Sequence, residues 1–171
     1  MVKQIRTKRL LLRQYKKGDE ESFLANINNP KVSRWTSGIP YPYSKEDLET
    51  GQTILARKQW KTEISFVITR ENEVIGGVSL RGIRKGHKAR IGYWLGEAYW
   101  GQGFMVEAIY AITKLGFEQF GLHRIEAKVF LPNKGSKRVL EKAGFRLEGL
   151  LKKEYLKNGK FIDAYLFAKV K

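Results

Sequence analysis

The sequence YWGQGFMV, residues 99–106, joins a strand-like segment to a long helical pattern. Its two glycines, Gly101 and Gly103, carry no side chain, so the backbone there can come close to a ligand. The first amide groups of a helix point outward, and the helix dipole adds positive potential at the same end. Together these features predict a phosphate-binding site that is formed by backbone N–H groups.

Two common kinds of glycine-rich phosphate loop do not match this stretch. A P-loop needs Lys and then Ser or Thr after its second glycine, but Phe104 and Met105 follow here. A dinucleotide-binding fingerprint needs a third glycine where Val106 stands, and a first strand near the start of the chain. A purely structural role, with the glycines serving in caps or packing, is the remaining alternative. We interpret the stretch as a pyrophosphate-binding loop placed late in a mixed sheet.

Periodicity outward from this loop predicts an α+β fold with a mixed, mostly antiparallel sheet of seven strands and about four helices. The segment from residue 88 to residue 130 is expected to supply a parallel pair of strands, with a helix between them. Expected strands are residues 8–15, 64–69, 74–81, 88–95, 124–130, 145–155 and 160–170. Expected helices are residues 19–27, 44–61, 103–121 and 133–143.

Local signals mark several ends of these elements. Asp19 is expected to cap the first helix, and Ser44 followed by Asp47 predicts the start of the second. Gly121 is expected to end the long helix. The segment Trp35–Ser44 is aromatic and interrupted by proline, which is typical of loops that line a site.

Composition limits the class of protein. With 171 residues the chain is expected to form one domain, residues 1–171. Cysteine is absent, which excludes thiol catalysis and disulfides and fits a cytoplasmic protein. No apolar stretch is long enough to span a membrane.

The charge is the unusual feature of the composition. Thirty-three Lys and Arg residues against seventeen Asp and Glu residues give a net charge of +16. Such a charge attracts polyanions and argues against a polycationic substrate such as a polyamine. Because the basic residues are dispersed, a solvated basic surface and a real anionic partner both remain open.

Read with its flanks, the loop resembles a known family. The segments IGYWLGEAYWGQGFMVEA, from Ile91, and HRIEAKVFLPNKGSKRVLEKAGFRLEG, ending at Gly149, resemble the GNAT superfamily of N-acetyltransferases. Within it they are similar to the RimJ/RimL-like group of ribosomal-protein-alanine N-acetyltransferases. The superfamily loop, Gln/Arg-x-x-Gly-x-Gly/Ala, falls on Trp100-x-x-Gly103-x-Met105, so its first and last positions depart from the pattern. Because backbone amides make the contacts, we expect these departures to alter packing more than pyrophosphate binding.

The resemblance implies acetyl-CoA as co-substrate, no metal, and two splayed parallel strands that admit the coenzyme. It implies that Asn133 hydrogen-bonds the coenzyme arm and that Ser136 returns a proton to the departing thiolate. Without the family, Asn133 is simply a helix N-cap and Lys137 an exposed helix charge. The coenzyme-binding residues that the resemblance implies are Tyr93, Trp94, Leu95, Gly101, Gln102, Gly103, Phe104, Met105, Asn133, Ser136 and Lys137.

Catalysis on an amine needs a neutral nucleophile. An N-terminal amine, with a pKa near 7.7–8.0, is partly neutral near neutral pH, whereas a lysine amine near 10.4 is not. A weak base acting through water is therefore sufficient for an α-amine, and the resemblance assigns this role to Glu97. The alternative for Glu97 is an exposed acid in a turn. Glu107 fits a favourable interaction with the helix dipole rather than catalysis. His87 and His123 lack the spacing of metal ligands.

Trp35, Tyr41 and Tyr43 are the candidates for the wall that contacts the acceptor. The expected function is acetylation of the N-terminal α-amine of a protein, acidic or ribosomal, by a monomer or homodimer that does not require nucleic acid. A small-molecule amine, such as an antibiotic or an amino acid, is an alternative acceptor. A basic nucleic-acid-binding protein, or a catalytically idle acyl-CoA sensor, is an alternative function.

Overall fold

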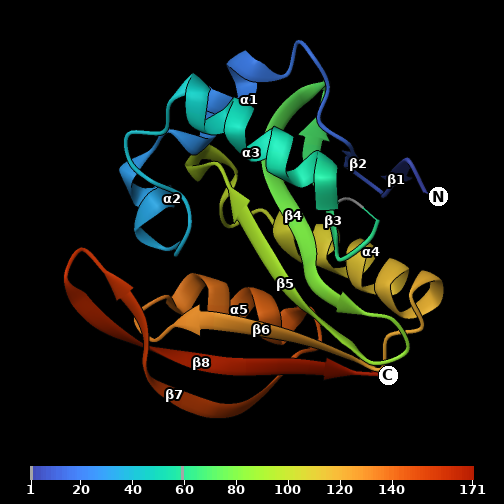
Figure 1. Ribbon diagram of the computed structural model, residues 1–171, viewed down its shortest axis with the longest axis vertical. Coiled ribbons are helices and arrows are strands. Elements are labelled where there is room, and N and C mark those ends of the chain that lie inside the picture. Colours follow the sequence, from blue (N-terminus) through green and yellow to red (C-terminus); the bar gives the residue numbers. More distant parts are fainter. Residues whose placement is uncertain (1, 59) are drawn as a thin grey trace.

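The computed structural model describes residues 2–58 and 60–171, which form a mixed eight-stranded sheet with helices on both faces (Figure 1). The order of strands across the sheet is β1-β2-β3-β4-β5-β6-β8-β7. The strands are β1 (Gln4–Arg6), β2 (Leu11–Arg13), β3 (Glu63–Arg70), β4 (Glu73–Arg84), β5 (Lys88–Leu95), β6 (Arg124–Phe130), β7 (Arg146–Lys157) and β8 (Lys160–Val170). The helices are α1 (Glu20–Ile27), α2 (Pro30–Arg34), α3 (Lys45–Lys58), α4 (Phe104–Gln119) and α5 (Lys134–Lys142), with a 3-10 turn η1 at Glu97–Tyr99.

This architecture confirms the expected α+β fold, with three differences near the N-terminus. The strand expected over residues 8–15 is shorter because the chain reverses at Thr7, whose N–H donates to the Leu10 carbonyl. The segment before this turn adds β1 as an eighth strand. The helix α2 lies outside the expected helices. Pro30 occupies its first turn, where proline is well tolerated.

Two expected helix ends are wrong in detail. Asp19 lies at the N-cap position of α1 but makes no side-chain capping bond. Its carboxylate instead accepts two hydrogen bonds from the Arg13 guanidinium and one from the Lys16 N–H. The helix α3 ends at Lys58 rather than near residue 61, and Trp60 has a φ of 66°, which no right-handed helix contains. The expected capping bonds between Ser44 and Asp47 are present.

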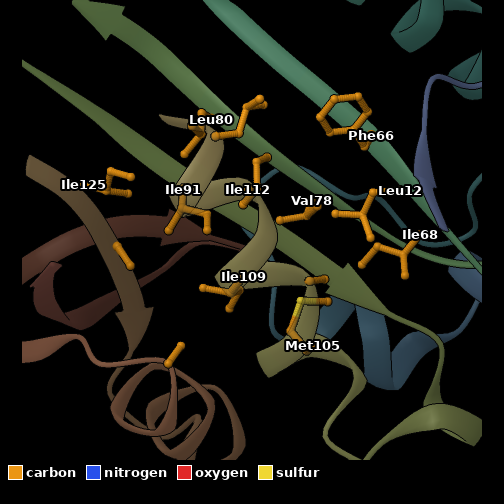
Figure 2. Close-up of a cluster of buried hydrophobic side chains, with 14 of the residues drawn as sticks. Leu12, Phe66, Ile68, Val78, Leu80, Ile91, Met105, Ile109, Ile112 and Ile125 are labelled. Carbon is orange, nitrogen blue, oxygen red and sulfur yellow. The ribbon is translucent and has the colours of Figure 1, made fainter. Parts of the chain in front are cut away.

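The main core lies between the sheet and the helices α4 and α5. Five residues spaced three or four apart along α4 and at its end are buried: Met105, Ile109, Ile112, Gly116 and Phe120. Figure 2 shows the first three of them packed among strand side chains such as Val78 and Ile125. At Gly116 an added Cβ would lie 2.9 Å from a Leu80 methyl carbon, so this glycine lets α4 approach the sheet closely. A smaller core on the opposite face joins α1 and α3 to the sheet, through Phe23, Ile27, Leu48, Val67 and Val74.

The parallel strands β5 and β6 separate along their length, as expected (Figure 1). They pair only where Lys88–Arg90 faces Arg124–Glu126. Beyond these residues β5 continues beside β4 as far as Leu95, and β6 continues beside β8 as far as Phe130. Within the described part of the chain, the facing edges of β5 and β6 therefore do not hydrogen-bond to each other beyond these residues. Such edges present backbone groups to a ligand.

Candidate active site

The loop that leads into α4 has the backbone geometry that its glycines predict. Gly101 and Gly103 have φ values of 77° and 79°, in the left-handed region that favours glycine. Gly103 is the N-cap of α4, and no atom lies within 4 Å of the position that a Cβ on Gly101 would take. Across residues 2–58 and 60–171, no protein acceptor takes a hydrogen bond from the amides of residues 101–106. These amides are available to an anion.

Arg9, from the turn between β1 and β2, holds this loop in place, a role that no sequence pattern predicts. Its Nη1 donates to the Gln102 carbonyl at 2.9 Å, and its Nε donates to Glu107 at 2.8 Å. The guanidinium also lies 4.5 Å from the centre of the Phe104 ring. These contacts connect residues more than ninety positions apart in the chain, so no local pattern announces them. They bring a cation to the positive end of α4.

Glu107 is held by the same N-terminal turn. Its carboxylate accepts hydrogen bonds from the Thr7 hydroxyl, at 2.5 Å, and from the Arg9 N–H, at 2.8 Å. Burial raises the pKa of this carboxyl, but the hydrogen bonds from Thr7 and Arg9 outweigh burial and leave the pKa below its ordinary value. Glu107 therefore remains an anion that joins the N-terminal turn to α4, which suits a structural role.

Trp100, at the first departure from the superfamily loop, ties the loop to the end of β5. Its indole Nε1 donates to the Leu95 carbonyl at 2.8 Å. Gln102 adds a second tie, because its side-chain amide donates to the Ala98 carbonyl at 3.0 Å. Trp94, the neighbour of Leu95, turns to the other face of the sheet, where its ring centre lies 5.1 Å from that of Phe23. Of these β5 residues, Trp94 thus packs on the smaller core.

Ser136 and Tyr93 meet between α5 and β5. The Tyr93 hydroxyl lies 2.6 Å from Ser136 Oγ. Asn133 is the N-cap of α5, and its side-chain oxygen accepts from the Ser136 N–H at 3.0 Å. Burial raises the pKa of Tyr93 above its ordinary value, so its hydroxyl stays protonated. Lys137 lies at the edge of this group, 5.5 Å from the Tyr165 ring centre.

Glu97 lies in η1, and its carboxylate faces α2. It accepts hydrogen bonds from Lys31 Nζ at 2.5 Å and from the Asn29 side-chain amide at 3.0 Å. The hydrogen bond from Lys31, followed by that from Asn29, holds the pKa of Glu97 below its ordinary value. A hollow of about 320 Å³ lies beside it, lined by Ala25, Asn26, Asn29, Glu97 and Ala98. Among the described residues no hydrogen bond or ion pair joins Glu97 to Ser136, so the two expected catalytic residues sit in separate clusters.

The three aromatic residues expected to line the acceptor site have different surroundings. Trp35 ends α2 and is covered by the Arg34 guanidinium, 4.9 Å from the ring centre. Tyr41 is 55% exposed, whereas Tyr43 packs against Phe23 in the smaller core. Their role at the acceptor site stays a prediction.

Lys157, which sequence reasoning missed, connects the end of the β7–β8 hairpin to the α2 region. Its Nζ donates to the carbonyls of Ser33 and Thr36, each at 2.5 Å. Burial lowers the pKa of Lys157, because the ammonium group loses contact with water. Figure 1 shows the tip of this hairpin rising toward α2 on the side where β5 and β6 diverge. The contact therefore links the β7–β8 hairpin to the α2 region, beyond the ends at which β5 and β6 have separated.

Two kinds of feature are absent from the described residues. No group of three His, Cys, Asp or Glu side chains is placed to hold a metal ion among them. No helix in the part of the chain that the structure describes is long and apolar enough to cross a membrane.

Comparison with known proteins connects this geometry to an activity. The family model described as "Acetyltransferase (GNAT) domain" matches residues 9–146. YoaA of Bacillus subtilis, an uncharacterized N-acetyltransferase, is 34% identical over 170 residues, covering 98% of this chain and 96% of YoaA. The ribosomal-protein-serine acetyltransferase of Escherichia coli is 36% identical over 106 residues, covering 61% of this chain and 59% of that protein. The structure of Mycobacterium smegmatis RimJ in complex with CoA-disulfide aligns with a TM-score of 0.83 and 26% identity, covering 94% of this chain and 81% of RimJ.

Proposed function

We propose that this chain, which belongs to the GNAT acetyltransferase family, transfers the acetyl group of acetyl-CoA to the N-terminal α-amine of a protein. Membership of the family makes the chain an acetyltransferase. The observation that carries the choice of donor is the row of unpaired amides at residues 101–106, where the helix α4 begins. The acceptor is inferred separately, from charge and from the relatives.

The donor side fits the diphosphate of a coenzyme. The amides of residues 101–106 and the Arg9 guanidinium supply positive potential at one end of the site. The divergence of β5 from β6 exposes a strand edge along which an extended pantetheine arm can hydrogen-bond. The relative RimJ is described with CoA bound as a disulfide, which supports the same coenzyme here. We assign the arm to the β5 edge at Tyr93–Leu95 and to Asn133.

Transfer then requires three actions from this chain. Backbone N–H groups on β5 polarise the thioester carbonyl as the amine nitrogen attacks its carbon. Glu97, kept ionised by its lowered pKa, takes the proton of the amine through water. Ser136 donates a hydrogen bond to the sulfur as the carbon–sulfur bond breaks and its electron pair moves to sulfur. A carboxylate with a lowered pKa is a weak base, which suits an α-amine better than a lysine amine.

A protein acceptor is favoured by two observations. The net charge of +16 attracts acidic polypeptides over distances of about 8–10 Å at ordinary salt. Relatives of this chain include an acetyltransferase named for a ribosomal protein. We therefore place an acidic or ribosomal protein ahead of a small amine.

A thiol-release assay with acetyl-CoA tests this proposal. We expect release with peptides that have a free N-terminus, and none with the same peptides when the N-terminus is blocked and only lysine amines remain. Amino acids, aminoglycosides and polyamines are the comparison acceptors. Faster release with one of these small amines would move the substrate class from proteins to small molecules, and no release with any amine would contradict the transferase assignment.

A further inference from the structure

Ser136 is held from two directions. Asn133 fixes its backbone N–H at 3.0 Å, and the Tyr93 hydroxyl contacts its Oγ at 2.6 Å. The two hydroxyl-bearing residues lie 43 positions apart and come from different elements, β5 and the first turn of α5. The Tyr93 ring packs against the main core, so the phenol oxygen has little freedom to move away from Ser136.

The direction of this hydrogen bond matters for chemistry. Each hydroxyl has a single proton to donate. If Ser136 donates to Tyr93, its proton is committed and cannot serve a substrate. If Tyr93 donates to Ser136, the serine proton is free to point at another acceptor. A phenol is a stronger acid than an aliphatic alcohol and therefore the better donor, so an acceptor beside Ser136 selects the second arrangement.

We infer that Tyr93 is a positioning residue for acetyl transfer: its hydroxyl donates to Ser136 Oγ and so directs the Ser136 proton toward the thioester sulfur. This inference rests on the proposed function, in which Ser136 donates a hydrogen bond to the departing thiolate. As the carbon–sulfur bond breaks, its electron pair goes to sulfur and Ser136 donates a hydrogen bond to the developing charge. The proton lost by the amine passes through water to Glu97, and the thiolate takes its proton from water.

Both hydroxyls keep their protons in this scheme. Burial keeps Tyr93 protonated, because a phenolate there would be poorly solvated. A serine alkoxide beside it would be less stable still. The pair therefore works as a chain of two hydrogen bonds, in which each bond polarises the next. Its effect is to stabilise charge that exists only while the carbon–sulfur bond is breaking, so it raises kcat rather than ground-state affinity.

A purely structural role would have different consequences. Buried hydroxyls generally find partners, and a Tyr93–Ser136 bond could serve only that purpose. In that case its loss would lower stability without separating kcat from KM. The variant Tyr93→Phe keeps the ring and removes only the hydroxyl, and Tyr15→Phe is a matched control. Tyr15 is a partly buried tyrosine that hydrogen-bonds Glu20 and packs on the smaller core.

The test compares wild type, Tyr93→Phe, Ser136→Ala and the double variant, with the best acceptor from the thiol-release assay. We expect Tyr93→Phe to lower kcat about tenfold, roughly the effect of weakening one hydrogen bond to a charged group. The KM for acetyl-CoA should stay within about twofold, because ground-state binding is unchanged. In the Ser136→Ala background the tyrosine substitution should have no further effect on kcat, since it acts through the serine. Tyr15→Phe should resemble wild type in kcat.

A second measurement varies the leaving group. A selenol is a stronger acid than a thiol, so the selenium analogue of acetyl-CoA needs less help as its bond breaks. The kcat loss in Tyr93→Phe should therefore shrink with this analogue. An unchanged kcat in Tyr93→Phe, an equal loss of kcat with acetyl-CoA and its selenium analogue, or additive losses of kcat in the double variant would overturn the inference. A wild-type protein that acetylates normally while Ser136→Ala has full kcat also overturns it and leaves acetyl transfer standing, whereas absence of transfer by the wild type contradicts the proposed function itself.

Discussion

The side that we assign to the acetyl donor and the side that we assign to the acceptor are built differently. The donor side consists of backbone: amides of residues 101–106, the edge of β5 and the first turn of α5. The acceptor side consists of side chains that bridge separate segments, such as Lys31 on Glu97 and Lys157 on the carbonyls of Ser33 and Thr36. Backbone groups bind a coenzyme in the same way whatever the side chains are. Side-chain bridges depend on which residues stand at both of their ends, so we expect them to set the acceptor.

The largest effect should come from the donor loop. Gly103→Val places a β-branched residue at a φ of 79°, which forces the loop to move and misdirects its amides. Loss of two or more hydrogen bonds to a charged diphosphate should weaken acetyl-CoA binding more than about 100-fold. Calorimetric titration measures this change.

The matched control is Gly82→Val. Gly82 has a φ of 59°, and an added Cβ meets no atom within 4 Å, so the backbone strain is comparable to that at Gly103. Gly82, however, lies in β4 near the start of β5, at the opposite end of β5 from the loop. Gly82→Val should bind acetyl-CoA like wild type. Equal loss of affinity in both variants would show that general destabilisation, and not the loop, explains the result.

The contrast also explains what could be predicted from sequence. The loop and α4 follow from glycine and apolar spacing within a few residues of each other, and the structure contains them. Arg9, Lys31 and Lys157 reach partners 66 to 124 positions away, and no local pattern specifies such contacts. Asp19 makes no capping bond because the Arg13 guanidinium binds its carboxylate instead.

The next effect concerns Glu97. In the native protein the hydrogen bond from Lys31 lowers the pKa of this carboxyl, so Lys31→Ala should raise that pKa toward its ordinary value. If the carboxylate must be ionised for transfer, the acid limb of the pH–rate profile moves to higher pH in Lys31→Ala. In Glu97→Gln the part of that limb due to the carboxyl disappears, the part due to protonation of the acceptor amine remains, and kcat falls by roughly 10²-fold if the residue is a general base.

The control for Lys31→Ala is Lys45→Ala, which removes an exposed lysine from a weak ion pair with Glu49 on α3. Its pH–rate profile should match that of wild type. A Lys31→Ala profile that also matches would remove Glu97 from the mechanism and leave its ion pair as a structural link between α2 and η1.

A smaller effect is expected at Arg9. Arg9→Ala removes a cation beside the loop and a donor to the Gln102 carbonyl. Because the Arg9 side chain is 41% exposed, water and salt screen its charge, and acetyl-CoA affinity should fall only about three- to tenfold. The loss should diminish as ionic strength rises. Lys8→Ala, at the exposed neighbouring position, should change little, and a comparable loss there would indicate a general effect of charge.

The smallest effect should appear at Lys157. Lys157→Met keeps most of the side-chain volume and removes the donor to Ser33 and Thr36. We expect acetyl-CoA affinity to stay the same and the KM for the acceptor to change by about two- to fivefold, the range of one hydrogen bond. Lys160→Met, at the exposed start of β8, is the control. A change in coenzyme affinity, with acceptor KM unaltered, would reverse the assignment of the two sides.

The assignment of the donor side depends on whether backbone amides at the start of α4 hold a coenzyme diphosphate. A crystal structure of the protein with CoA tests it most directly. We predict diphosphate oxygens within about 3 Å of amide nitrogens in residues 101–106, with the arm running along the separated edge of β5. A diphosphate bound by side chains elsewhere, with these amides facing only water, would contradict the account.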